Sequence, residues 1–334
     1  MRAFALEELG APGSVVEVPV PEPAEGQVRI RVAAAGLNPF DDAVLQGYLK
    51  DQMEHRFPLI PGMDAAGTVD AVGEGVVELA IGDDVFGSVG KRHLGEGVIE
   101  LAIGDEVFGS VGKRHLGEGT AAGSATMSTA TIARRPAGVA DTDAAAMPVA
   151  GVTALTMVET ASVSDGDVVV AIGATGGVGS YLVQLAAKRG ARVLAISSAA
   201  NTDYARTLGA DEAVDYEAGD VVEAVRSLAP EGVDVIAEMH GGDDTARLAE
   251  LVRSGGRVVS AVGGADEEGL KARGIEAANI MGMVSTASLE TLAGMLERGE
   301  LVSPEIRTFP LTDAAEAFAH VATGHTRGKI VVIP

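Results

Sequence analysis

The chain has 334 residues, of which 48 are acidic and 25 are basic, so its formal net charge at pH 7 is −23. The negative electrostatic field of such a chain repels nucleic acid and anionic membranes, so we expect neither as a partner. The chain has no cysteine, which excludes disulfides, thiol catalysis and zinc sites built on thiolates.

The beginning of the chain, MRAFALEELG, lacks the long apolar core of a signal peptide. No later stretch is apolar for the roughly 18 residues that a membrane-spanning helix needs. We therefore expect a cytoplasmic protein. A chain of this length is expected to form two domains.

The first part of the chain consists of short runs with alternating apolar residues. Residues 14–20 and 27–33 are typical of strands, and the proline-containing turn PEPAEG separates them. Gly62 and Gly67 interrupt the apolar pattern of further predicted strands. After Gly119, the run TAAGSATMSTATIARRP has the character of another strand. These patterns predict a compact, mainly antiparallel first domain.

Residues 73–116 contain one 22-residue unit twice: residues 73–94 are followed without a gap by residues 95–116. The copies differ by one Val-to-Ile and one Asp-to-Glu exchange. Two units are too few for a repeat fold, so we interpret them as a tandem duplication or an error in assembling the sequence. Each copy carries an apolar run and the strand sequence Val-Phe-Gly-Ser-Val. The sequence therefore leaves open which copy occupies the sheet.

The stretch from Asp167 to Ser198 predicts strand, glycine turn, helix and strand in succession. Residues 167–172 form a β-branched apolar run, a helical pattern begins near Gly177, and residues 192–197 form the second strand. Glycines let the backbone approach a pyrophosphate, whose charge then lies against the NH groups at the start of the helix. The turn predicted to bind phosphate comprises Gly173, Ala174, Thr175, Gly176, Gly177, Val178 and Gly179.

Strand and helix patterns alternate on both sides of this turn. A connecting helix is predicted over residues 141–159, before the turn, and the later pattern is typical of a doubly wound parallel sheet. Strands are expected at 213–214, 233–237, 257–262 and 275–284, helices at 221–228, 244–252 and 289–301, and a last strand in the tail GKIVVIP.

Six motifs occur in an order that is typical of one family. They are N-P-x-D at 38–41, F-P-x-x-x-G-x-D-x-x-G-x-V at 57–69, G-D-x-V-F-G, the glycine turn, L-G-A-D at 208–211 and G-H-x-x-G-K-I-V at 324–331. Together they resemble the zinc-independent quinone oxidoreductases of the medium-chain dehydrogenase/reductase superfamily, the group that includes ζ-crystallin.

The resemblance implies an α/β protein with two domains. A Rossmann doubly wound domain is expected over residues 142–285. A mainly β, GroES-like catalytic domain is expected from residues 1–141 together with residues 286–334, because in this family the tail rejoins the first domain.

NADP(H) is the expected cofactor. A carboxylate at the end of the second strand would hold the ribose hydroxyls of NAD, but Ser197 and Ser198 stand there. Asn201 occupies the place where many relatives have a lysine, and Arg206 is either the alternative cation or an exposed helix residue. The resemblance further implies Thr153 beside the nicotinamide and Lys329 in cofactor binding.

No metal is expected. Zinc-dependent relatives have a cysteine near the N-P-x-D position and a histidine in the segment held here by Gly62, Met63 and Asp64, and both are missing. The six histidines show no ligand spacing. The Tyr-x-x-x-Lys pair of short-chain dehydrogenases is also missing, which excludes that chemistry.

The resemblance implies NADPH-dependent, zinc-free reduction of small quinones or α,β-unsaturated carbonyl compounds. Its pocket would lie between the domains and contain Asn38, Asp41 and Tyr48. Tyr48 is interpreted either as a proton donor or as a packed loop residue, and Asn38 and Asp41 either as catalytic or as turn-shaping residues. A homodimer is expected through the strand at 275–284.

Two alternatives remain open. One is a non-catalytic NADPH-binding sensor or a structural protein of the crystallin kind, because such a protein would need the same glycine turn. The other, an enoyl-thioester reductase, would need a basic groove for a carrier phosphate, which so acidic a chain does not favour.

Overall fold

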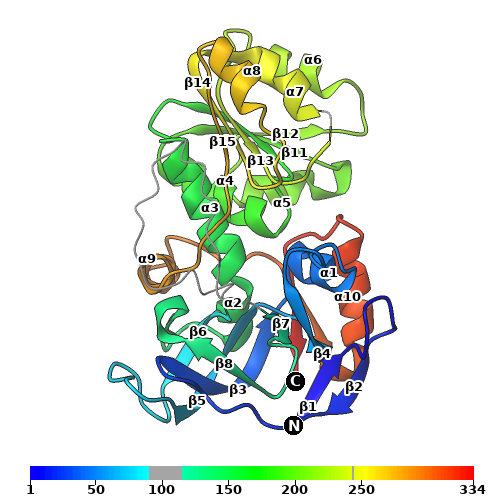
Figure 1. Ribbon diagram of the computed structural model, residues 1–334. Coiled ribbons are helices and arrows are strands. Elements are labelled where there is room, and N and C mark those ends of the chain that lie inside the picture. Colours follow the sequence, from blue (N-terminus) through cyan, green and yellow to red (C-terminus); the bar gives the residue numbers. More distant parts are fainter. Residues whose placement is uncertain (90–114, 243) are drawn as a thin grey trace.

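The computed structural model describes residues 1–89, 115–242 and 244–334, which form two lobes built on two sheets (Figure 1). We call them the parallel-sheet lobe and the mixed-sheet lobe. Both chain termini lie in the mixed-sheet lobe, and helices α2 (Asp141–Ala146) and α3 (Pro148–Thr160) lead from it into the parallel-sheet lobe.

The parallel-sheet lobe contains six parallel strands in a doubly wound order. From one edge to the other they are β12 (Glu212–Asp215), β11 (Arg192–Ser197), β10 (Val168–Ile172), β13 (Val233–Glu238), β14 (Val252–Ser260) and β15 (Glu276–Asn279). The chain enters at β10, moves outward to β12, and then crosses back to β13 on the other side of β10. This order confirms the predicted Rossmann architecture.

Helices cover both faces of this sheet because its strands are apolar on both sides. Val169 and Ala171 pack in one core with α3 and α4 (Gly177–Lys188), whereas Val170 and Ile172 pack in a second core. The helices that contribute to the second core are α6 (Val221–Leu228), α7 (Asp244–Leu248) and α8 (Glu267–Ala272). The short α5 (Thr202–Thr207) lies with the first core.

The mixed-sheet lobe contains a seven-stranded sheet whose centre is the long strand β3. Its path is β16 (Ile306–Pro310), β17 (Lys329–Ile333), β3 (Gln27–Gly36), β5 (Asp64–Val72), β6 (Asp84–Ser88) and β9 (Ile132–Arg134), with β8 (Ser124–Ser128) also on β3. Two small sheets join β1 (Arg2–Ala5) to β2 (Ser14–Glu17) and β4 (Glu54–Ile60) to β7 (His115–Glu118).

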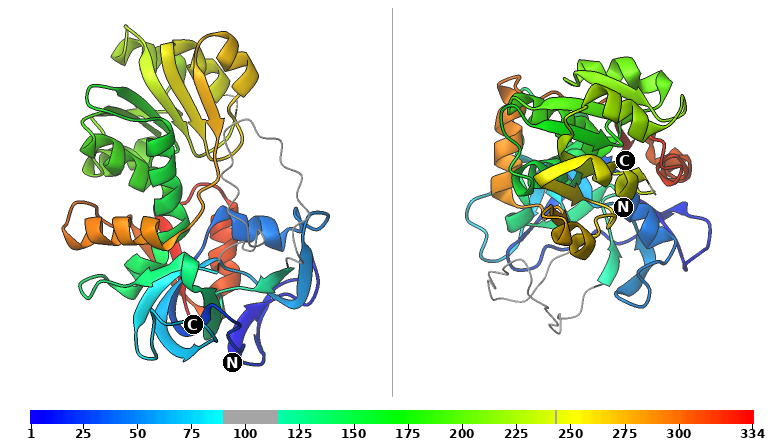
Figure 2. Two further views of the ribbon diagram at one scale, coloured as in Figure 1. Left: turned by 60° about the vertical axis from the view of Figure 1, so that its left-hand side comes forward. Right: turned by 90° about the horizontal axis from the view of Figure 1, so that it is seen from above.

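The last strand, β17, joins the mixed-sheet lobe, which also contains the start of the chain. β17 pairs antiparallel with β3 and parallel with β16. Helices α1 (Pro39–Leu45) and α10 (Ala314–Ala322) belong to the same lobe. Helix α9 (Thr286–Glu297) packs against both α3 and β9, so it bridges the lobes (Figure 2).

Several predicted elements differ from the structure. The strand expected over 257–262 spans Val252–Ser260, and the helix expected over 289–301 spans Thr286–Glu297. The helix expected over 141–159 is divided between α2 and α3, because Pro148 has no N–H to continue the first helix and instead begins the second. The helix expected over 244–252 ends at Leu248, and Val252 already belongs to β14. The strand expected over 275–284 stops at Asn279. The side-chain amide of Asn279 exchanges two hydrogen bonds with the backbone of Ala265, and the chain leaves the sheet there.

The first copy of the duplicated unit supplies the strand of the sheet. β6 pairs with β5 and β9, and Phe86 in β6 is fully buried. The last residues of the second copy, His115 and Leu116, begin β7 beside β4. The strand sequence of the second copy, and with it any hairpin or packing of Phe108, lies outside the described residues.

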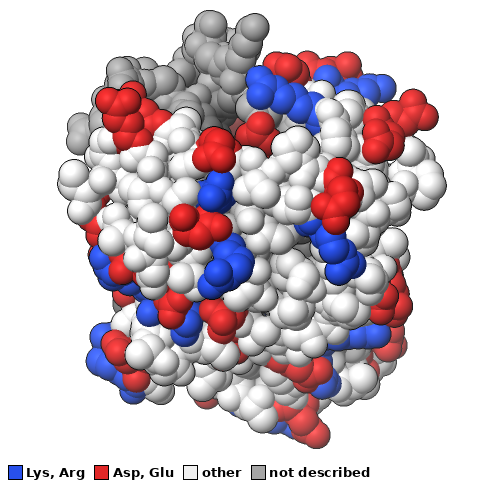
Figure 3. All heavy atoms as spheres, turned by 90° about the horizontal axis from the view of Figure 1, so that it is seen from below, with Lys and Arg blue, Asp and Glu red and all other residues white. Residues whose placement is uncertain are grey.

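Within residues 1–89, 115–242 and 244–334, every helix is too short or too polar to cross a membrane. Acidic and basic side chains are interspersed on the face of the molecule shown in Figure 3.

A matched pair of deletions tests the single-copy interpretation. Deleting residues 95–116 keeps Asp84, which accepts hydrogen bonds from Thr68 Oγ1 at 2.9 Å and Arg135 at 3.0 Å. Deleting residues 73–94 places the glutamate of the second copy there instead. We expect both proteins to fold, to bind NADPH and to be at least as thermally stable as the full chain, since a long insertion contributes little to stability.

The variant that lacks residues 73–94 should be the less stable of the two, by less than about 1 kcal/mol. The deletion alters the ion pair between Arg135 and Asp84, whose carboxylate is half exposed. Thermal unfolding followed by circular dichroism measures both. Failure of either variant to fold would contradict the interpretation.

Candidate functional site

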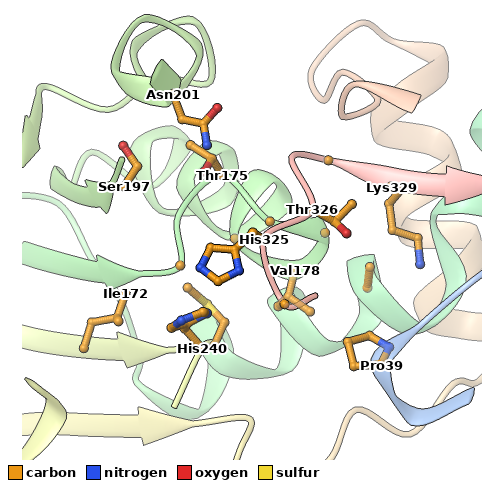
Figure 4. Close-up of a pocket in the computed structure, with 18 of the residues that line it drawn as sticks. Pro39, Ile172, Thr175, Val178, Ser197, Asn201, His240, His325, Thr326 and Lys329 are labelled. Carbon is orange, nitrogen blue, oxygen red and sulfur yellow. The ribbon is translucent and has the colours of Figure 1, made fainter. Parts of the chain in front are cut away.

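A cavity of about 450 Å³ lies where the carboxyl ends of the parallel strands face the mixed-sheet lobe (Figure 4). Its walls come from the loops after β10, β11, β12 and β13, from the start of α1, and from the tail segment that leads into β17. In open parallel sheets, ligands bind at this edge, where the strand order reverses. The cavity therefore lies where the fold predicts a binding site.

The glycine turn forms the floor of the cavity. Gly173 has a φ of +78°, a conformation that side chains other than glycine rarely adopt. A Cβ atom at Gly179 would lie 2.2 Å from the carbonyl oxygen of Gly173, so only glycine fits there. Because α4 begins at Gly177, its first N–H groups and its positive dipole end lie at the cavity. This cradle fits the diphosphate of a dinucleotide.

The residues predicted for the cofactor divide into two groups. The turn residues predicted from the sequence line the cavity, except Ala174, which is buried beneath it. Ser197, Ser198, Asn201 and Lys329 also line the cavity.

Arg206 and Thr153 are not among the lining residues. The guanidinium of Arg206 is half exposed and pairs with Asp203 at 3.2 Å, one turn away on the same helix. Thr153 is covered by the segment after β15, because a Cβ atom at Gly282 would lie 2.3 Å from Thr153 Oγ1.

A buried polar chain forms the part of the cavity wall that adjoins the start of α4. The ammonium of Lys329 donates to the carbonyl of Leu37 at 2.6 Å and to Asn38 Oδ1 at 2.7 Å. The Asn38 amide donates to Asp64 at 2.9 Å, and the backbone N–H of Val149 donates to the same carboxylate oxygen at 3.1 Å. Asn38 is thus held from both ends, with its position in the cavity wall set by Lys329 and Asp64.

Burial perturbs both charged ends of this chain. Desolvation raises the pKa of Asp64 to about 6, although Lys329 and the hydrogen bonds from Asn38, Val149 and Ser88 oppose the shift. Desolvation lowers the pKa of Lys329, and the carboxylates of Asp64 and Asp41 oppose that shift. Each group therefore helps to keep the other ionised.

Of the three residues proposed from the sequence as catalytic, only one lies at the cavity. Asn38 lines the cavity. Asp41 is buried, and its carboxylate accepts the backbone N–H of Asn38 at 2.8 Å in the capping box of α1, which is a structural role. Tyr48 follows the end of α1, is 74% exposed and lies outside the cavity lining.

The sequence reasoning missed several lining residues, among them the polar residues Tyr216, His240, Asp244, His325 and Thr326. Tyr216 follows β12 and His240 follows β13, so the rule that ligands bind at the carboxyl ends of parallel strands was the signal for these two. His325 and Thr326 lie in the G-H-x-x-G-K-I-V motif before β17, and that motif was the signal for them, because the resemblance placed its Lys329 in cofactor binding.

In the part of the chain that the structure describes, no group of three or more histidine, aspartate or glutamate side chains is arranged to hold a metal ion.

Comparisons with known proteins agree with this architecture. Residues 24–158 match the family described as alcohol dehydrogenase GroES-like domain, and residues 208–332 match the family described as zinc-binding dehydrogenase. An NADPH-dependent alkenal/one oxidoreductase of Arabidopsis thaliana chloroplasts is 32% identical over 94% of this chain and 74% of the relative. The chain belongs to the medium-chain dehydrogenase/reductase superfamily.

Solved structures of this superfamily superpose on the whole chain. The quinone oxidoreductase from Coxiella burnetii is 28% identical, with a TM-score of 0.85, over 100% of this chain and 99% of the other. A protein described as an NAD-dependent alcohol dehydrogenase is 30% identical, also with a TM-score of 0.85, over 100% of both chains. The resemblance inferred from the sequence motifs is thereby confirmed.

For a medium-chain dehydrogenase/reductase, the arrangement divides into two parts. Gly173 to Gly179 and the strand end at Ser197 can hold a dinucleotide along the parallel sheet. Leu37, Pro39 and Ala150 add apolar surface at the end near Asn38 and Lys329. A reducible substrate bound there would face one ammonium and one carboxamide.

Lys329→Met tests the electrostatic coupling of the polar chain. In the unaltered protein the pKa of Asp64 is raised on folding, so the folded state binds a proton more tightly than the unfolded state does. The contribution of Asp64 to the free energy of unfolding therefore falls as the pH rises from about 4 to about 6, and it is constant above that range. Without the ammonium, the pKa of Asp64 should rise further. We expect the variant to lose about 3 to 5 kcal/mol at pH 8, where a buried carboxylate is left unpaired, and clearly less at pH 5.

Urea unfolding at the two pH values measures this difference. Lys50→Met, in an exposed loop position, is the control and should change stability little at either pH. Equal losses for Lys329→Met at pH 5 and pH 8 would contradict the proposed coupling with Asp64.

Proposed function

We propose that this protein reduces small quinones or α,β-unsaturated carbonyl compounds with NADPH and without zinc. The observation that carries the proposal is the cavity, which runs from the glycine turn to the Asn38–Lys329 wall between the two lobes. The names of the relatives support the same class of reaction. The bound cofactor would supply the hydride.

The chain's own residues have four tasks in this proposal. The turn at Gly173–Gly179 and the start of α4 bind the diphosphate. Leu37, Pro39 and Ala150 exclude water from the acceptor end. The one N–H of the Lys329 ammonium that does not bind Leu37 or Asn38 can stabilise the oxygen on which negative charge develops. Asn38 holds that ammonium in place.

NADPH is proposed over NADH because no carboxylate stands at the end of β11. Ser197 is buried at the cavity, and Ser198 and Asn201 continue its wall. A 2′-phosphate next to these residues meets hydroxyl and amide groups, whereas an aspartate there would repel it. Arg206 is not part of this proposal, because its side chain pairs with Asp203.

A homodimer is proposed through β15. This strand is the edge of the six-stranded sheet, and Met281 and Met283, which follow it, are 64% and 56% exposed. Pairing of two such edges would cover these side chains. Both the dimer and the cytoplasmic location expected from the sequence remain predictions.

Ser198→Asp tests the cofactor preference. We expect the variant to bind NADPH at least about tenfold more weakly and NADH equally well or better, because the new carboxylate lies beside the 2′-phosphate and can accept the ribose hydroxyls. Ser198→Asn, which is similar in size but neutral, is the matched control. Dissociation constants of both cofactors provide the measurement. Equal or tighter binding of NADH by the unaltered protein would refute the preference.

The reaction itself is tested by following NADPH absorbance with a panel of small quinones, enones and the corresponding saturated ketones. We expect oxidation of NADPH with quinones or enones, no reaction with the saturated ketones, and unchanged rates after dialysis against a strong chelator. Activity that is lost on dialysis and restored by zinc would refute the zinc-free reaction.

Tyr48→Phe belongs in the same assay as a control. Because Tyr48 lies outside the cavity, the turnover rate of the variant should stay within about twofold of that of the unaltered protein. Loss of a general acid would instead lower the turnover rate by about 100-fold or more. Binding of NADPH without turnover of any acceptor would favour the non-catalytic alternative.

A further inference from the structure

Two histidines from different lobes meet in the cavity. His240 follows β13 in the parallel-sheet lobe, and His325 lies in the tail segment between α10 and β17. Their ring centroids are 6.0 Å apart and the rings meet edge to face at 71° (Figure 4). Neither residue has a role in the function proposed above.

Both imidazoles are held beside the glycine turn. The Cβ of His240 lies 3.2 Å from the point that a Cβ on Gly173 would occupy. The Nδ1 of His325 lies 2.6 Å from the carbonyl oxygen of Thr323, which can only accept a hydrogen bond, so Nδ1 carries the proton. The Nε2 of His325 therefore remains as the atom that can bind a ligand.

The cavity needs positive charge that its other side chains supply only in part. Lys329 is the only lysine or arginine among the described residues that line it, and its ammonium is held by Leu37 and Asn38. Asp244 is the only acidic residue in that lining. A dinucleotide brings at least two negative charges into a protein whose net charge is −23.

We propose that His240 and His325 together bind a phosphate group of the dinucleotide, and that they take up protons when it binds. The inference rests on the proposed function, because it assumes a dinucleotide on the glycine turn. Imidazolium groups donate from both ring nitrogens and make charge-assisted hydrogen bonds to phosphate. Cofactor affinity therefore rises as the pH falls through the range in which imidazoles ionise.

The groups around the pair act in opposite directions. Asp244 places a negative charge in the cavity lining, whereas Lys329 and the positive end of α4 place positive charge there. Tyr216 also lines the cavity. A bound phosphate adds negative charge beside both rings, so the protonated pair is stabilised chiefly in the complex. Without the ligand, two protonated rings in contact would repel each other.

The test is the pH dependence of cofactor dissociation constants between pH 6 and pH 8 at constant ionic strength. The fluorescence of the reduced nicotinamide, which is excited at wavelengths that protein side chains do not absorb, reports binding. NADH is measured beside NADPH, because the 2′-phosphate of NADPH itself titrates with a pKa of about 6. The contribution of the histidines should appear with both cofactors.

We expect the unaltered protein to bind NADH about tenfold more tightly at pH 6 than at pH 8, and the double variant His240→Asn/His325→Asn to bind it with less than about a twofold change. His325→Arg, which keeps a permanent charge, should bind more tightly at pH 8 and depend less on pH. The matched control is His320→Asn, because His320 lies outside the cavity and contacts Arg307 and Phe309. Circular dichroism checks that each variant is folded.

The same pH dependence in the unaltered protein and in the double variant would overturn this inference and leave the proposed function standing. Failure of the unaltered protein to bind either cofactor at any pH would overturn both.

Discussion

The cavity wall depends on the side chain of Lys329, whose ammonium binds within the mixed-sheet lobe and whose aliphatic part contacts the start of α4 in the parallel-sheet lobe. The ammonium binds the backbone of Leu37 and the side chain of Asn38, while the aliphatic part of Lys329 packs where a Cβ on Gly177 would lie, 2.9 Å from its Cδ. The last strand, the end of β3 and the start of α4 thus meet at one side chain. A buried charge is costly, and here Asp64, held through Asn38, offsets the cost.

Small residues allow α2 to lie very close to the sheet of the mixed-sheet lobe. A Cβ on Gly36 would lie 2.0 Å from the carbonyl oxygen of Ala145, and Ala144, Ala145 and Ala146 in α2 are fully buried. Aromatic residues make up only 3% of the chain, and at this contact small residues take the place of large side chains. Helix α2 leads into α3, whose Ala150 lines the cavity, so this close contact helps to position the cavity wall.

The chemistry of the cavity follows from the same construction. Its positive features are a helix N-terminus and one buried ammonium, two imidazoles also line it, and Leu37, Pro39 and Ala150 give it apolar surface. Such surroundings suit a reaction in which the cofactor carries the chemical step and the protein provides orientation and stabilises developing negative charge. Asp41 contributes by capping α1, which in turn positions Asn38.

The amino-acid sequence by itself determined the elements whose causes are local. The strand Arg192–Ser197, the helix Val221–Leu228 and the start of α4 at Gly177 have the predicted bounds, because apolar periodicity and glycine conformation act over a few neighbouring residues. Only the tertiary structure decided which copy of the duplicated unit supplies β6, since two nearly identical segments have the same local preferences and differ in their partners β5 and β9. It also decided that Tyr48 points to solvent and that His240 meets His325, because these outcomes depend on how distant segments pack.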